Sequence, residues 1–158
     1  MADQSSQEFD RIDRALLRAL QEDASQTIAE LAELVNLSTN ACWRRIKRFE
    51  EQGVIRSRVA LLEPNAIGLQ LTAFVSIRTN QHNPQWLTSF AEGVAAIPEV
   101  VEFYRLSGDI DYLLKIHLRD IADYDRVYKA LISTAPIADV TSSFTMEEIK
   151  HTTALPVP

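Results

Sequence analysis

The stretch between Ser38 and Arg58 holds the side chains best suited to binding a charged partner. It carries six basic and two acidic residues, a net charge of +4, although the formal net charge of the whole chain is −6. A helix beginning at Ser38 buries an apolar stripe and displays short polar and guanidinium groups on its other side, namely Ser38, Thr39, Asn40, Arg44 and Arg48. Because Asn and Arg pair with adenine and guanine edges in the major groove, this helix is predicted to bind double-stranded DNA.

Three further arginines in this stretch each have two interpretations. Arg45 either faces DNA or packs its stem across the preceding helices and binds an acidic partner there. Arg56 and Arg58 either contact phosphates or protect an ordinary edge strand with their charge. A basic run can also be a solvated helix face, but the turn and the predicted wing beside it favour DNA binding.

A second candidate site is the segment Gly108-Asp109-Ile110-Asp111-Tyr112, which separates two apolar runs. The carboxylates of Asp109 and Asp111 are suited to binding the ammonium group of an amino acid, and exposed backbone amides in the same turn to binding its carboxylate. The competing interpretation is hairpin chemistry, since Gly-Asp forms turns in many proteins.

Patterns for catalysis or metal binding are missing from the sequence. Cys42 is the single cysteine, so no intrachain disulfide can form, and its place on an apolar stripe indicates a small buried hydrophobe. His82, His117 and His151 show no metal-ligand spacing. Without a catalytic Ser-His-Asp order or a phosphate-binding glycine loop, we expect no enzyme activity, no cofactor and no metal.

Helix signals fill the first third of the chain. Asp10 and Thr27 are predicted N-caps of two helices, Ser38 caps a third, and Gly53 ends it. The short turn before Ser38 makes the last two helices a helix-turn-helix. The run from Val54 to Leu62 is β-branched and basic and predicts a wing, and the segment 64–70 is rich in turn residues and predicts a hinge.

Strand and helix signals alternate after the hinge in the order βαββαβ. The predicted strands begin at Leu71, Val100, Ile110 and Val140, and the predicted helices run from Pro84 and from Asp120 to Ala135. This order is typical of a ferredoxin-like, four-stranded antiparallel sheet with both helices on one face. We expect the other face to carry Phe74, Val101 and Phe103, an apolar surface that favours dimerisation.

The sequence therefore predicts an α+β protein of two domains: a winged helix-turn-helix over residues 1–63, a hinge over 64–70 and a βαββαβ domain over 71–158. The hydrophobic fraction of 46% and the charged fraction of 24% are those of a globular protein. No apolar run is long enough to cross a membrane, and the first residues do not form a signal peptide, so we expect a cytoplasmic protein with no membrane partner.

Several segments, in order, resemble the Lrp/AsnC family of leucine-responsive or feast/famine regulators. They are Phe9–Leu17, Leu37–Ile55, Ser107–Lys115 and Met146–Lys150, so the resemblance spans nearly the whole chain. It implies a transcriptional regulator of amino acid metabolism genes. It also implies sheet-to-sheet homodimers that often assemble into octamers and bind an amino acid effector between subunits.

The resemblance also assigns site residues. It implies that Arg45 faces DNA together with the five residues named for the third helix. It implies that Gly108, Asp109, Asp111 and Tyr112 shape the effector pocket, with Ile121, Ser143, Phe144 and Thr145 lining it from neighbouring elements. The alternatives are an amino-acid-binding protein without DNA binding and a small metabolic enzyme, because ferredoxin-like sheets also host catalysis.

Overall fold

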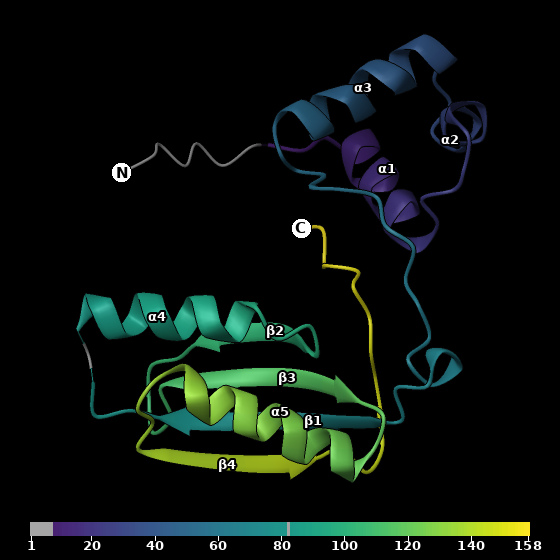
Figure 1. Ribbon diagram of the computed structural model, residues 1–158. Coiled ribbons are helices and arrows are strands. Elements are labelled where there is room, and N and C mark those ends of the chain that lie inside the picture. The colour runs from purple at the N-terminus through teal and green to yellow at the C-terminus, as the bar shows by residue number, and fades with distance from the viewer. Residues whose placement is uncertain (1–7, 82) are drawn as a thin grey trace. The chain divides into compact units, whose positions relative to one another are not determined.

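A computed structural model describes residues 8–81 and 83–158, and these form two units (Figure 1). The helical unit comprises residues 8–60 and 150–158, and the sheet unit comprises residues 61–149. Residues 150–158 thus belong to the helical unit, whereas the sequence pattern predicts them within the second domain. His82, one of the three histidines considered for metal binding, lies outside the described residues.

The helical unit contains α1 (Arg11–Glu22), α2 (Ile28–Leu34) and α3 (Thr39–Glu51). All three begin where the sequence predicts, because the side chains of Asp10, Thr27 and Ser38 each accept a hydrogen bond from a backbone N–H three residues further on. Asn36 has a φ of +53° in the turn between α2 and α3. An asparagine tolerates this left-handed conformation, so the chain can reverse tightly enough to form the helix-turn-helix.

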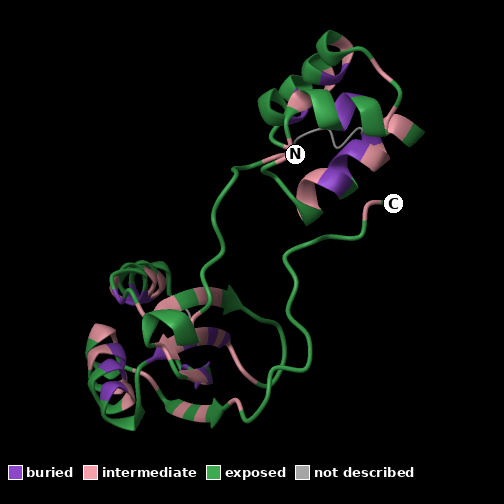
Figure 2. Cartoon of the chain, turned by 90° about the vertical axis from the view of Figure 1, so that its right-hand side faces the viewer, coloured by how far each residue is buried: buried purple, intermediate pink, exposed green. Residues whose placement is uncertain are grey.

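An apolar cluster holds the three helices together, with Leu16, Leu31, Ile46 and Phe49 at most 2% exposed. Figure 2 marks the buried residues of each helix in purple. The tail formed by residues 150–158 adds to this unit. Val157 packs against the cluster, the Arg18 guanidinium donates to the Val157 carbonyl at 3.1 Å, and Gln21 exchanges hydrogen bonds with the backbone of Leu155. These bonds to α1 explain why the tail groups with the helices.

The segment after α3 differs from the predicted wing strand. Val54 and Ile55 pack against the helical cluster, and the Ile55 N–H donates to the Phe49 carbonyl at 3.1 Å. Residues 56–63 are exposed, and no strand is assigned between residues 54 and 70. A lone strand has no stability without a neighbour to pair with. The predicted hinge contains a short 3₁₀ helix, Asn65–Ile67, closed by Gly68 at a φ of +84°.

The sheet unit has the predicted order of elements. These are β1 (Leu71–Arg78), α4 (Pro84–Ala95), β2 (Val100–Arg105), β3 (Tyr112–Leu118), α5 (Ile121–Thr134) and β4 (Asp139–Phe144). The strands form one antiparallel sheet in the order β2-β3-β1-β4, as expected for a ferredoxin-like domain. The last strand ends at Phe144, before the predicted end at Ile149.

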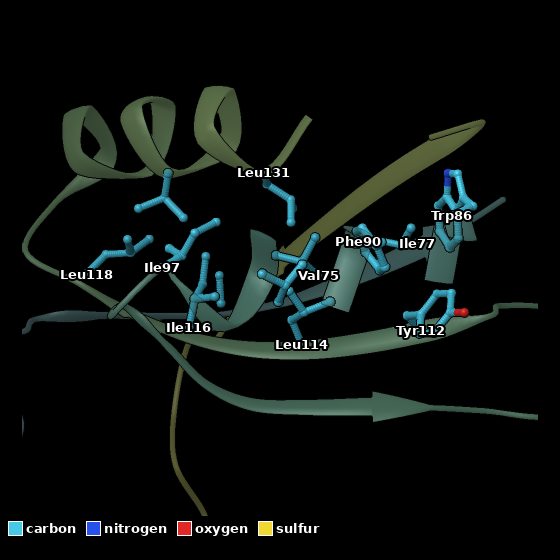
Figure 3. Packing of buried hydrophobic residues seen from close by; sticks show 13 residues of the cluster. Val75, Ile77, Trp86, Phe90, Ile97, Tyr112, Leu114, Ile116, Leu118 and Leu131 are labelled. Atoms are coloured by element: carbon cyan, nitrogen blue, oxygen red, sulfur yellow. The ribbon is translucent and has the colours of Figure 1, made fainter. Parts of the chain in front are cut away.

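One sheet face packs against α4 and α5. Figure 3 shows alternate side chains of β1 and β3, including Val75, Leu114 and Ile116, in the same cluster as Phe90 of α4 and Leu131 of α5. Period-two alternation along β3 buries Tyr112, Leu114, Ile116 and Leu118, each at most 4% exposed. This core fixes which residues of each strand remain on the other side.

The other side, here called the open sheet face, lacks one of the three apolar residues predicted for it. Phe74 is 39% exposed there, but Phe103 lies with the core, in an edge-on contact with Phe90 at 5.6 Å between ring centroids. The cause is a bulge between Val100 and Glu102, which reverses the alternation along β2. Tyr104 and Glu102 consequently share a face with Leu113 and Lys115, their partners on β3.

Candidate DNA interface and effector site

The exposed side of α3 carries the predicted base-contacting residues. Cys42, Ile46 and Phe49 are buried, and burial raises the pKa of the Cys42 thiol, consistent with a core residue. Between Thr39 and Lys47 the exposed residues follow helical spacing, and they define the α3 outer face: Thr39, Asn40, Trp43, Arg44 and Lys47. Lys47 and Trp43 were not among the predicted site residues, although their spacing from Asn40 places them on the same side of a helix.

An ion-pair network fixes α3 against α1. Asp13 of α1 is only 3% exposed, and its two carboxylate oxygens accept hydrogen bonds from Arg45 Nη1 and Arg48 Nη2, both at 2.7 Å. Arg45 Nη1 also donates to Asp10 Oδ2 at 2.6 Å. Arg45 therefore has the structural role that the sequence left open, and Arg48 shares it.

The ion pairs and hydrogen bonds of this network stabilise the charged forms of Asp10 and Arg45. The N–H of Asp13 and the Arg45 guanidinium stabilise the Asp10 carboxylate and lower its pKa. Asp10 and Asp13 in turn raise the pKa of Arg45. The Arg48 side chain is still 45% exposed and its guanidinium carbon lies 5.3 Å from the centre of the Phe49 ring. Arg48 can thus hold Asp13 and present remaining N–H donors to solvent.

The remaining predicted DNA-binding residues flank the helix. Ser38 uses its hydroxyl oxygen as the cap of α3, which places it at the helix N-terminus beside Thr39. Arg56 is exposed on the segment that follows α3, and Arg58 there donates to Glu50 at 3.1 Å. The structure thus gives Ser38 and Arg58 local partners, whereas Thr39, Asn40 and Arg44 lie on the α3 outer face.

The predicted effector turn is a tight loop over residues 107–111. Gly108 has a φ of +141°, a conformation that side-chain-bearing residues rarely adopt. The Leu106 N–H donates to the Asp111 carbonyl at 2.8 Å, and Asp111 Oδ2 accepts from the Thr79 N–H at 2.8 Å. Asp111 therefore ties the loop to the end of β1, and Asp109 is the exposed carboxylate.

Tyr112, predicted to shape the effector pocket, is a core residue in the single chain. Its side chain is 4% exposed and its ring lies 5.1 Å from Phe90 and 5.9 Å from Trp86, between ring centroids. The β3 alternation points it toward the helices, so it supports the loop from the core and offers no open surface.

The other predicted effector residues lie at the opposite end of the sheet. Asp111 precedes β3, whereas Ile121 follows it, and Phe144 pairs with Ala73 near the start of β1. The seven residues of β3 span roughly 20 Å. Ser143 and Phe144 also point to opposite faces, because the ring of Phe144 contacts Tyr124 of α5 at 5.1 Å. A single chain therefore does not bring the 107–111 loop together with Ile121 and residues 143–145.

The described residues were also compared with the requirements of a metal site and of a membrane-spanning helix. Among the described residues, no cluster of His, Cys, Asp or Glu could hold a metal ion. Across residues 8–81 and 83–158, no helix has the length and apolar character needed to cross a membrane.

Comparison with known proteins gives two family matches, one over the N-terminal helices and one over the sheet unit and residues 150–155 of the tail. Residues 9–56 match a winged helix-turn-helix DNA-binding domain, and residues 72–155 match an Lrp/AsnC ligand binding domain.

Full-length relatives show the same pairing of domains. The chain is 53% identical over 150 residues to a glutamate uptake regulatory protein of Zymomonas mobilis, covering 95% of this chain and 92% of that protein. Its structure resembles an AsnC family transcriptional regulator from Agrobacterium tumefaciens with a TM-score of 0.90 and 56% identity, covering 94% of this chain and 97% of that one. A transcriptional regulator of Neisseria meningitidis, solved in complex with L-Met, matches with a TM-score of 0.90 and 37% identity over 94% and 97% of the two chains.

Proposed function

The chain belongs to the Lrp/AsnC family of DNA-binding transcriptional regulators, and from this premise we propose which of its residues contact DNA and which bind an amino acid effector. A regulator of this kind must share a compartment with DNA, so we place it in the cytoplasm.

The α3 outer face is the DNA-reading surface, and the observation that carries this proposal is its rigid support by Asp13. With α3 held against α1, Asn40 and Arg44 are presented to adenine and guanine edges in the major groove. Ser38 and Thr39 lie at the helix N-terminus, where backbone N–H groups favour a phosphate. The free donors of Arg45 and Arg48, together with Arg56 and Arg58, supply phosphate contacts that set the register.

The test is a titration of fluorescent DNA from upstream of the protein's own gene, followed by anisotropy. Arg44→Ala should weaken specific binding by about 1–3 kcal/mol, because a bidentate base contact is lost. The matched control is Lys129→Ala, which removes one positive charge from an exposed pair with Asp125 on α5. If Arg44→Ala binds as tightly as the control, the α3 outer face does not read DNA.

The effector site is a shared one, formed between two copies of the chain. Asp109 in the 107–111 loop binds the ammonium group of an amino acid, and Gly108 lets the loop backbone approach its carboxylate. Asp111 holds the loop in place, and Ile121 and residues 143–145 come from the second copy. The roughly 20 Å between these groups within one chain supports this arrangement. The solved complex of the Neisseria relative with L-Met supports an amino acid as the ligand class.

Calorimetry with a panel of L-amino acids tests this assignment. Asp109→Asn should abolish measurable binding of the amino acid selected by the panel. Asp111→Asn should weaken it less, because an amide oxygen can still accept from the Thr79 N–H. Asp125→Asn on α5 is the control for loss of an exposed carboxylate. Unchanged binding by Asp109→Asn rejects the site.

The homodimer forms through the open sheet face, where exposed Phe74 lies opposite Lys115 and exposed Tyr104 lies opposite Leu113. Lys115 and Glu102 form an ion pair on this face at 3.6 Å, with the Lys115 side chain only 13% exposed. These charged groups would help to fix the alignment of the two sheets in the dimer. Pairing of two chains would place two α3 helices in successive major grooves of a partly palindromic DNA site, and dimers would assemble further, to octamers. Phe74→Arg should give monomers in analytical ultracentrifugation; dimers at the same concentration would reject this interface.

A further inference from the structure

Trp43 stands in the middle of the α3 outer face and is not used by the fold. Its side chain is 50% exposed, and the apolar cluster of the helical unit closes without it. It is the fifth residue of α3, three residues after Asn40 and four before Lys47, so the three side chains share one side of the helix. The indole therefore lies among the groups proposed to face DNA.

The exposed indole of Trp43 is suited to packing against a binding partner, and the charged side chains around it indicate which kind of partner. Tryptophan buries more area than any other side chain when it is covered, so leaving half of it in water forgoes a large gain. Arg44 and Lys47 beside it repel a second copy of the same cationic face and attract a polyanion. The first turns of a recognition helix are also the part that approaches base edges. These observations favour DNA over another protein surface.

We propose that Trp43 is a specificity-determining residue that packs against the C5-methyl group of a thymine in the major groove. Thymine is the only base that presents an apolar group there, and the indole of Trp43 is the largest apolar group on the α3 outer face, far larger than the methyl group of Thr39. Asn40, one turn earlier, would contact a neighbouring adenine. This inference rests on the proposed DNA-reading role of α3. It adds that Trp43 makes the helix prefer a thymine at one position of the DNA site.

The test removes the two halves of the contact separately. A tight-binding duplex is selected from a random-sequence pool with the full chain, and each thymine in it is replaced by uracil, which lacks only the methyl group. Binding is followed by anisotropy with the unsubstituted protein and with Trp43→Ala. One uracil should weaken binding of the unsubstituted protein about fourfold, the effect of one methyl-sized apolar group. The same uracil should have no effect on Trp43→Ala, which itself binds the thymine duplex at least fourfold more weakly.

Control variants separate this inference from the proposed function. Ile132→Ala removes an exposed apolar side chain of α5 and should bind both duplexes like the unsubstituted protein. Thermal unfolding of Trp43→Ala should be unchanged, because the residue is outside the core.

The outcomes are distinct. If no duplex is selected, both the proposed function and this inference fail. If Arg44→Ala loses affinity but every uracil is neutral for the unsubstituted protein, the DNA-reading role stands and the thymine contact is overturned. If Trp43→Ala weakens binding of random-sequence DNA as much as the selected duplex, Trp43 contacts the backbone and the inference is again overturned.

Discussion

Each unit of the molecule buries one carboxylate against two arginines, but the two arrangements differ in how far along the chain their partners lie. Asp13 in the helical unit binds Arg45 and Arg48, which are 32 and 35 residues away and belong to another helix. Asp123 in the sheet unit binds Arg119 and Arg126, which are four and three residues away. Asp123 thus strengthens the start of one helix, whereas Asp13 joins two.

The carboxylate–arginine bonds of Asp13 and Asp123 therefore have different structural roles. The pair of bonds at Asp13 sets the position of α3 relative to α1, and with it the direction of the α3 outer face. The bonds at Asp123 hold the first turn of α5, and Arg126 extends them to Glu99 just before β2. Removing Asp13 leaves Arg48 without its carboxylate, and removing Asp123 does the same to Arg119, because Arg45 and Arg126 keep Asp10 and Glu99. Only the first loss should disturb DNA binding.

The largest expected effect is that of Asp13→Ala. Removing one partner of a buried ion pair is costly, and because Arg45 and Arg48 are partly exposed we expect a loss of about 2–4 kcal/mol in the unfolding free energy of the helical unit. Hydrogen exchange of the α1–α3 amides measures it. Asp10→Ala, at the exposed end of the same network, is the milder control. Equal losses for the two variants would contradict a central role for Asp13.

A second experiment compares two arginines of α3. Arg48→Ala should lower both the stability of the helical unit and DNA affinity, each by about 1–3 kcal/mol, because Arg48 holds Asp13 as well as facing solvent. Arg44→Ala should lower DNA affinity alone. Anisotropy and hydrogen exchange on the same two variants provide the readouts. Loss of stability in Arg44→Ala would show that the two roles are not divided as described.

Acid should affect the sheet unit through Asp123. Hydrogen bonds from the Arg119 and Arg126 side chains lower the pKa of this carboxyl from 3.8 to about 2, against the opposing effect of burial. Its contribution is therefore fully present above pH 4 and is lost as the pH falls from about 4 to about 2, a loss of roughly 1–2 kcal/mol. Fluorescence of Trp86, which is buried in this unit, follows unfolding. Asp123→Asn should flatten the pH dependence in this window, and an unaltered curve would exclude Asp123 as its source.

The smallest effect expected is that of deleting residues 151–158. The deletion removes the bonds from Arg18 and Gln21 and the packing of Val157, so the helical unit should lose about 1 kcal/mol. Trp86 fluorescence should report unchanged stability of the sheet unit. A loss confined to the sheet unit would mean that the tail serves that unit instead.

Local chemistry made much of this fold predictable. Asp10, Thr27 and Ser38 cap their helices through bonds that span three residues, and period-two alternation along β1 and β3 defines a buried face. The order of strands and helices then leaves few ways to arrange one antiparallel sheet. The basic, polar side of α3 was visible for the same reason, since helical spacing alone separates Asn40 and Arg44 from Ile46.

Only the tertiary structure decided the features that depend on long-range contacts. The bulge in β2 moved Phe103 into the core, the tail joined α1, and the predicted wing formed no strand within residues 54–63. Asp13 became the partner of Arg45 and Arg48, and the predicted effector residues separated to the two ends of β3. A sequence pattern indicates on which face of its own helix or strand a residue lies. Packing decides which residue of a distant element contacts it, because many side chains of similar chemistry could occupy each place.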